Sequence, residues 1–126
     1  MDGRQSERDA GQRLGSNYSE QKSFRDGQEV PYGIKDGTRP RWYKSGSSIE
    51  VKNYDIQTVD GQDRLVGNVV DQAMSRASNL PQGTVQSLII DVRGQTVSRA
   101  VLGDVVNRSS TGTGGTISSA NITILR

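Results

Sequence analysis

The chain contains no cysteine and no histidine, and these two absences exclude several kinds of site. Without cysteine there is no disulfide framework, no thiolate metal site and no cysteine nucleophile. Without histidine there is no Ser-His-Asp triad, no imidazole-bound zinc and no imidazole general base. Any chemistry must therefore depend on carboxylates, lysine, arginine, tyrosine or hydroxyl groups.

Apolar and aromatic residues are also scarce. Hydrophobic side chains make up 31% of the 126 residues and aromatic ones 5%, and the mean hydropathy is -0.67. No apolar run approaches the roughly 20 residues of a membrane-spanning helix, so we expect no membrane span in this domain. The length suits one domain over residues 1–126, with residues 1–5 expected to be flexible. The net charge of +2 permits a polyanionic partner without requiring one.

Periodic patterns in the second half of the chain predict an α/β domain. The expected elements are a β-hairpin over 41–44 and 48–54, a helix over 60–80, a strand over 85–92, a helix over 98–108 and a strand over 122–125. A hairpin followed by strand–helix–strand crossovers predicts a mixed sheet with helices on both faces.

Three other segments have weaker patterns. Residues 6–14 predict a first helix with Ser6 as its N-cap. Residues 26–40 are interrupted by glycine and proline, so we expect loops there. Residues 109–119 are rich in serine, threonine and glycine, which predicts a flexible loop.

The stretch SSIEVKNYD, residues 47–55, places Glu50 and Lys52 two positions apart on one expected strand. Because side chains alternate along a strand, both point to the same face, about 7 Å apart at the backbone. That spacing lets both side chains reach one small ligand or metal ion. A solvated face with an incidental ion pair explains the same pattern, and it predicts that the two side chains lie apart from any cleft and from Glu7.

The sequence GTRPR at 37–41, followed by SIEVKNY at 48–54, carries a recognisable pattern. It resembles the PD-(D/E)XK nuclease motif, in which Pro-Asp opens one strand and (Asp/Glu)-x-Lys lies on the next. Over residues 6–126 the layout is similar to the small C-terminal nuclease domains of bacterial polymorphic toxins, including contact-dependent growth inhibition toxins. The resemblance implies a restriction-endonuclease-like core, a mixed β-sheet flanked by helices.

This resemblance also implies a metal-dependent active site. In such nucleases, carboxylates hold a divalent metal ion that polarises the scissile phosphate, and a lysine orients water or stabilises the developing charge. Glu50 is then a metal ligand and Lys52 the catalytic lysine. A second acidic ligand would come from the first helix as Glu7, with Glu20 as the fallback. The implied metal is Mg²⁺ or Mn²⁺, with Zn²⁺ as an alternative.

Three polar residues on later elements are further candidates. Gln72 and Arg76 lie four positions apart on the polar side of the helix after the motif, where relatives place a residue near the phosphate. We assign Gln72 a catalytic role and Arg76 a nucleic-acid contact; an ordinary polar solvent face is the simpler explanation of both. Asp91 ends the strand over 85–92, where it either approaches the metal or caps the following turn.

Basic residues are concentrated in the first 44 positions. We assign Arg39, Arg41 and Lys44 to contacts with the nucleic-acid backbone, with Trp42 and Tyr43 as candidate stacking partners for a base. A charged surface with Trp42 in the core explains the same pattern.

One position departs from the family pattern. Arg41 follows Pro40, where the motif has its aspartate, and a cation there removes a metal ligand and repels Mg²⁺. Three explanations compete: an inactivating substitution that allows a toxin to be produced, a naturally inactive variant, or a site that uses Asp36 or Asp55 instead. We favour the first, because an active nuclease in the cytosol kills the cell that makes it.

The sequence thus predicts a metal-dependent endonuclease toxin domain that cleaves phosphodiester bonds in DNA or structured RNA such as tRNA, inactivated in this chain by Arg41. The resemblance implies delivery from a secreted or cell-surface toxin into the target-cell cytoplasm, and a cognate immunity protein that docks over the active-site cleft. The alternative is a non-catalytic nucleic-acid-binding or protein-interaction domain that retains the nuclease fold.

Overall fold

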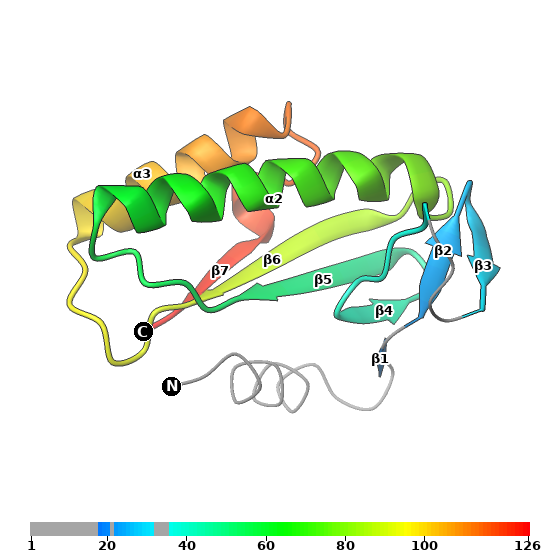
Figure 1. Ribbon diagram of the computed structural model, residues 1–126, viewed down its shortest axis with the longest axis horizontal. Helices are drawn as coiled ribbons and strands as arrows, with labels where there is room; N and C mark the ends of the chain where they lie inside the picture. Colours follow the sequence, from blue (N-terminus) through cyan, green and yellow to red (C-terminus); the bar gives the residue numbers. More distant parts are fainter. Residues whose placement is uncertain (1–17, 21, 32–35) are drawn as a thin grey trace.

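A five-stranded mixed sheet forms the centre of the fold, in the strand order β1-β4-β5-β6-β7 (Figure 1). The computed structural model describes residues 18–20, 22–31 and 36–126. The strands of this sheet are β1 (Ser19–Glu20), β4 (Trp42–Lys44), β5 (Ser47–Lys52), β6 (Val85–Asp91) and β7 (Ile122–Leu125), and a 3₁₀ helix, η1 (Ser119–Asn121), precedes β7. Strands β5, β6 and β7 are parallel, whereas β4 and β1 are antiparallel to their neighbours. The predicted α/β class and mixed sheet are confirmed.

Two helices, α2 (Val59–Asn79) and α3 (Arg99–Gly112), connect the parallel strands and cover the same face of the sheet (Figure 1). Two right-handed crossovers that proceed in one direction along a sheet place their helices on one side. The prediction of helices on both faces of the sheet is therefore wrong for α2 and α3. The predicted helix over 6–14 and residues 1–5 lie outside the described residues. In the ranges that the structure describes, no helix combines the length and the apolar composition needed to cross a bilayer.

The hairpin predicted around Gly46 is present. Strand β4 pairs with β5 in antiparallel register, with Trp42 opposite Ile49 and Lys44 opposite Ser47. Gly46 has a φ of +86°, a backbone conformation that glycine adopts without steric cost. This hairpin sets the register of β5, the strand that carries Glu50.

A second hairpin has its turn and its second strand in the segment 26–40, which we expected to form loops. Strands β2 (Ser23–Arg25) and β3 (Gln28–Val30) pair as a separate two-stranded sheet. Asp26 and Gly27 at its turn both have positive φ, 52° and 81°. Asp-Gly is typical of tight hairpin turns, so this dipeptide was the signal in the sequence for the hairpin.

The segment over 109–119 also differs from the predicted loop. Helix α3 continues to Gly112, so the first four residues of the segment are its last turn. The side chains of Ser109, Thr113 and Ile117 are buried. Thr113 Oγ1 accepts a hydrogen bond from the backbone N–H of Ile117 at 3.1 Å. Serine and threonine hydroxyl groups can form hydrogen bonds with backbone groups at a helix end. A segment rich in these residues can therefore form a packed turn as well as a loop.

Apolar layers lie on both faces of the sheet. Strand β6 contributes to both: Leu88 and Ile90 face the helices, and Ile89 faces the other way. The layer under the helices consists of Ile56, Leu65, Val69, Ala73, Leu88, Ile90, Val92, Leu102, Val105 and Ile117. The opposite layer contains Ile49 and Val51 of β5 together with Ile89 and Leu125. Side chains alternate along β5, so Glu50 and Lys52 are directed toward the helices.

A glutamine and a threonine fix the start of α2. Gln95 Nε2 donates to the Tyr54 carbonyl at 2.7 Å, and Gln95 Oε1 accepts from the Ile56 N–H at 3.0 Å. Thr58 caps the helix, since its Oγ1 accepts from the Gly61 N–H at 3.1 Å. These contacts tie the loop after β5 to the loop after β6 and thereby hold α2 over β5.

Candidate functional site

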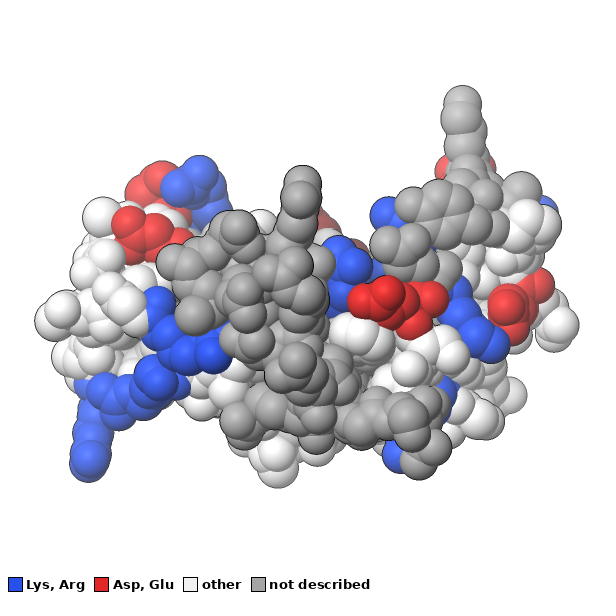
Figure 2. Space-filling view, turned by 90° about the horizontal axis from the view of Figure 1, so that it is seen from below, with Lys and Arg blue, Asp and Glu red and all other residues white. Residues whose placement is uncertain are grey.

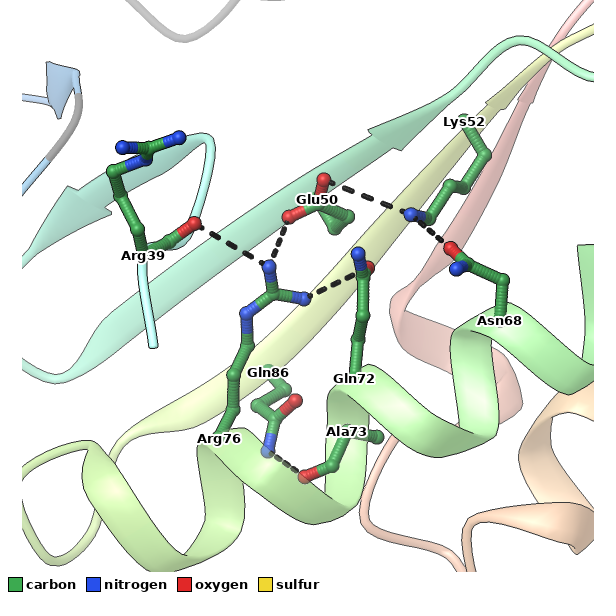
Figure 3. A network of polar contacts seen from close by, with 8 residues as sticks. All are labelled: Arg39, Glu50, Lys52, Asn68, Gln72, Ala73, Arg76 and Gln86. Carbon is green, nitrogen blue, oxygen red and sulfur yellow. Dashed lines mark hydrogen bonds and ion pairs between the residues drawn. The ribbon is translucent and has the colours of Figure 1, made fainter. Parts of the chain in front are cut away.

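Glu50 and Lys52 point into the space between β5 and α2 (Figure 3). Their side chains are 16% and 8% exposed, and Glu50 Oε1 lies 3.9 Å from Lys52 Nζ. The prediction that the two share one face is confirmed. The alternative of an ion pair on a solvated face is wrong, because that face of the strand is covered by α2.

Arg76 of α2 pairs directly with Glu50 (Figure 3). Its Nη2 donates to Glu50 Oε2 at 2.5 Å and to the Arg39 carbonyl at 3.5 Å, and its Nη1 donates to Gln72 Oε1 at 3.3 Å. Only 6% of Arg76 is exposed, so the solvent-face interpretation is wrong for this residue. Its Nε is buried and has no hydrogen-bond partner among the described residues.

Asn68 of α2 holds the ammonium group of Lys52. Its Oδ1 accepts a hydrogen bond from Lys52 Nζ at 2.5 Å. Asn68 is not among the site residues predicted from the sequence. Asn68, Gln72 and Arg76 recur every four positions, so they form one polar stripe along α2, and that spacing was the available signal.

A polar pocket of about 210 Å³ opens beside Glu50. Its walls come from the segment before β4, from β5 and from α2. The lining residues are Arg39, Pro40, Arg41, Glu50, Gln72 and Arg76. Three arginines and one glutamate give this lining a formal charge of +2. The structure therefore brings together four sequence-predicted residues around Glu50, with Lys52 next to them on the same strand.

The face of the sheet opposite the helices carries charged groups of both signs (Figure 2). Figure 2 shows the molecule from the side opposite the helices, where Lys and Arg groups are interspersed with Asp and Glu groups. Lys44, a predicted nucleic-acid contact, is exposed on β4 and does not line the pocket; its Nζ lies 4.9 Å from the ring centre of Tyr18.

The aromatic side chains beside the motif are packed. Tyr43 is buried against Phe24 and Leu80, with 4.5 Å between the centres of the two rings. Trp42 packs against the apolar layer that contains Ile49. The interpretation of Tyr43 as a base-stacking residue is therefore wrong, and the interpretation of Trp42 as a residue of the core is favoured.

The described residues do not fit a divalent metal ion. Within 18–20, 22–31 and 36–126, no three acidic side chains lie close enough together to hold a metal. Glu50 is the carboxylate among the residues lining the pocket, and Arg76 and Lys52 both lie beside its oxygens. Cations in these positions compete with Mg²⁺ for the same carboxylate. The second predicted ligand, Glu7, lies outside the described residues.

Four other predicted acidic candidates do not line the pocket. Glu20 and Asp36 are exposed. Asp55 is also exposed, and its Oδ1 accepts from the Gln57 N–H at 3.0 Å. Asp91 is buried, and its Oδ1 accepts from the Arg93 N–H at 3.0 Å, which confirms the interpretation of Asp91 as the cap of the following turn.

Burial lowers the pKa of Lys52 from its ordinary value of 10.5; the charge of Glu50 raises it and that of Arg76 lowers it. Burial also lowers the pKa of Arg76, and the charge and hydrogen bond of Glu50 oppose that shift. A lysine that loses its proton more readily in the folded state makes the free energy of unfolding depend on pH.

We predict that the folded state gains stability from Lys52 as the pH rises toward 10.5. Between the lowered folded-state pKa and the ordinary value, the unfolded chain binds more protons, so the free energy of unfolding increases with pH. Urea unfolding across this interval measures the effect. The free energy of unfolding of the parent minus that of Lys52→Met should increase with pH. Lys44→Met, which changes an exposed lysine, is the matched control. A decrease of this difference with rising pH would contradict the prediction.

A scan against protein-family models found no match, and searches of curated proteins and of solved structures found no similar chain. The nuclease resemblance consequently depends on the motif residues and on the order of the elements.

Proposed function

We propose that this chain is a nuclease-type domain that acts on phosphodiester bonds of DNA or structured RNA, with cleavage prevented by Arg41. The observation that carries the proposal is the position of Glu50 and Lys52. Both face α2 beside a polar pocket with a formal charge of +2, and Gln72 and Arg76 complete that side of the pocket. Glu50 thus lies where a phosphate group can approach it, with Lys52 Nζ 3.9 Å behind its carboxylate.

The chemistry of each side chain suits a phosphodiester. Guanidinium groups of Arg39, Arg41 and Arg76 can donate charge-assisted hydrogen bonds to phosphate oxygens. Lys52 can stabilise the negative charge that develops on the phosphate during hydrolysis. With arginine at position 41, the described pocket has one carboxylate, whereas hydrolysis in this motif class uses two.

Binding without cleavage is the second candidate function. It is favoured by the guanidinium group of Arg41 in the lining of the pocket, where the motif has an acidic group. An acidic side chain at position 41 distinguishes the two functions. It would allow cleavage in a nuclease-type domain and would not do so in a domain that only binds.

We expect Arg41→Asp to cleave plasmid DNA or total tRNA in Mg²⁺ or Mn²⁺, whereas the parent chain does not. A second carboxylate beside Glu50 reduces the positive charge of the pocket and supplies the acidic group that the motif requires. Adding Lys52→Ala to this variant should lower the cleavage rate by about 10²-fold or more, as is typical when one group that stabilises developing charge is removed. Gel analysis of both substrates measures the rates.

Arg64→Asp is the matched control, because Arg64 lies exposed on α2 and does not line the pocket. It makes the same charge change and should leave both substrates intact. Failure of folded Arg41→Asp to cleave either substrate in either metal would reject catalysis and favour binding alone. Cleavage that survives Lys52→Ala would reject the role of Lys52.

The proposal includes a toxin that acts in the cytoplasm of a target cell and an immunity protein that covers the pocket. Acidic groups on such a partner would face Arg39 and Arg41. Expression inside bacteria tests the toxic effect: Arg41→Asp should arrest growth, and the parent chain should not. Equal growth with both chains, at equal expression, would argue against a toxin.

A further inference from the structure

We propose that the pocket binds a phosphate group directly through its guanidinium groups and does not need a divalent cation. The inference rests on the proposed function for its ligand, the phosphate group of a nucleic-acid backbone. It differs from the predicted metal site in the role of Glu50. Here Glu50 positions Arg76 and does not hold a metal ion.

Both carboxylate oxygens of Glu50 face cations of the protein. Oε2 accepts from Arg76 Nη2 at 2.5 Å, and Oε1 lies 3.9 Å from Lys52 Nζ (Figure 3). A metal ion that took either oxygen would leave a buried charged side chain without its partner, which is costly in a protein interior. Arg76 and Lys52 are each 6% exposed, so bulk water would be a poor replacement for the lost carboxylate partner.

Arg76 still has hydrogen-bonding capacity. Its Nε is buried without an acceptor among the described residues, and buried N–H groups in folded proteins are rarely left unpaired. Arg76 lines the pocket, and its Nη1 carries two N–H groups, one of which donates to Gln72 Oε1, so the guanidinium group can also donate to an oxyanion bound there. A phosphate oxygen is a suitable acceptor, because its bonds to a guanidinium group are charge-assisted.

The segment before β4 places two further guanidinium groups in the same lining. The Arg39 carbonyl accepts from Arg76 Nη2 at 3.5 Å, and Pro40 is buried, which fixes the backbone between Arg39 and Arg41. Together with Glu50, the three arginines give the described lining residues a formal charge of +2. This charge complements a phosphate group.

The size of the pocket limits the ligand. Its volume of about 210 Å³ is the volume that about seven water molecules occupy in liquid water. A phosphate group with a few waters fits this space, and the guanidinium groups of the lining complement its charge. We therefore infer that the pocket contacts one phosphate of the backbone and that the rest of the nucleic acid lies outside it.

Binding of a fluorescent single-stranded oligonucleotide to the parent chain, followed by anisotropy, tests this inference. We expect affinity in EDTA at least as high as in Mg²⁺. Arg41→Gln should weaken binding about tenfold, the loss of one charge-assisted hydrogen bond, whereas Arg64→Gln on the exposed side of α2 should change it less than about twofold. Inorganic phosphate should compete with the oligonucleotide. A requirement for Mg²⁺, equal losses in the two arginine variants, or no competition by phosphate would each overturn the inference.

Glu50→Gln separates the two roles of the carboxylate. If Glu50 positions Arg76, the amide oxygen still accepts its hydrogen bond, and the oligonucleotide binds in EDTA at least as tightly because one negative charge is gone. If Glu50 instead holds a cation needed for binding, this variant loses binding, which would overturn the inference. Circular dichroism checks that the variant is folded.

Cleavage and binding are separate measurements, so the inference and the proposed function can fail separately. A parent chain that binds in EDTA, with Arg41→Asp never cleaving, supports direct phosphate binding and rejects catalysis. Cleavage by Arg41→Asp, with a parent chain that binds nothing in EDTA, overturns direct phosphate binding and leaves the nuclease proposal in place.

Discussion

Arg76→Met should lower the free energy of unfolding by about 3–5 kcal/mol, the cost typical of a buried charge that loses its partner. The Glu50 side chain is 16% exposed, and without Arg76 its nearest described cation is Lys52 Nζ at 3.9 Å. Methionine fills most of the space of the arginine stem, so the change removes charge more than volume. Urea unfolding of the parent and the variant measures the loss.

Arg64→Met is the control for the loss of an arginine from α2. Arg64 makes an exposed pair with Asp60 at 3.2 Å, and exposed pairs contribute about 1 kcal/mol or less. Combining Arg76→Met with Glu50→Gln should recover part of the stability, because the carboxylate charge is then removed with its partner and Lys52 keeps its hydrogen bond to Asn68 Oδ1. If Arg76→Met costs no more than Arg64→Met, Glu50 does not depend on Arg76.

Gly61→Ala should destabilise the domain by about 3 kcal/mol, the upper end of the usual cost of overpacking. A Cβ at this position would lie 1.8 Å from the backbone oxygen of Asp55. The obstacle is main chain, so no rotamer change relieves it, and the loop before α2 must move. Thermal unfolding followed by circular dichroism measures the effect.

Gly67 in the same helix provides the matched control. A Cβ there meets nothing within 4 Å, so Gly67→Ala should stabilise the helix by up to about 1 kcal/mol. The two variants make the same chemical change and should shift the melting temperature in opposite directions. Equal shifts would mean that the close approach at Gly61 does not constrain the start of α2.

The regular elements were predictable because their apolar periodicity is set by burial on one face. Apart from the end of α3, the described boundaries of the helices and of the strands of the main sheet that we predicted agree to within about two residues. The β2–β3 hairpin was missed, because the glycine and proline content of 26–40 outweighed its Asp-Gly signal. The side of the sheet that each helix covers depends on strand order, which periodicity does not specify.

The site was predictable only in part. The motif identified Glu50 and Lys52, and alternation along the strand placed them on one face. The Arg76–Glu50 pair joins side chains 26 residues apart, on a strand and a helix whose polar stripes face each other. Treated alone, a polar stripe on a helix predicts solvent exposure, so Asn68 and Arg76 could not be recognised as buried from α2 by itself.

The parallel pairing of β5 with β6 has a consequence for folding. The β4–β5 hairpin and α2 each form from residues that are close together in the sequence. The pairing of Ser47 with Val85, in contrast, joins two residues that have the whole of α2 between them in the sequence. Contacts that close a long loop form late, because the chain loses the entropy of loop closure before these contacts stabilise it. The pocket needs α2 docked on β5, so we expect it to assemble in the last stage of folding, and a partly folded chain carries Glu50 and Lys52 without a site.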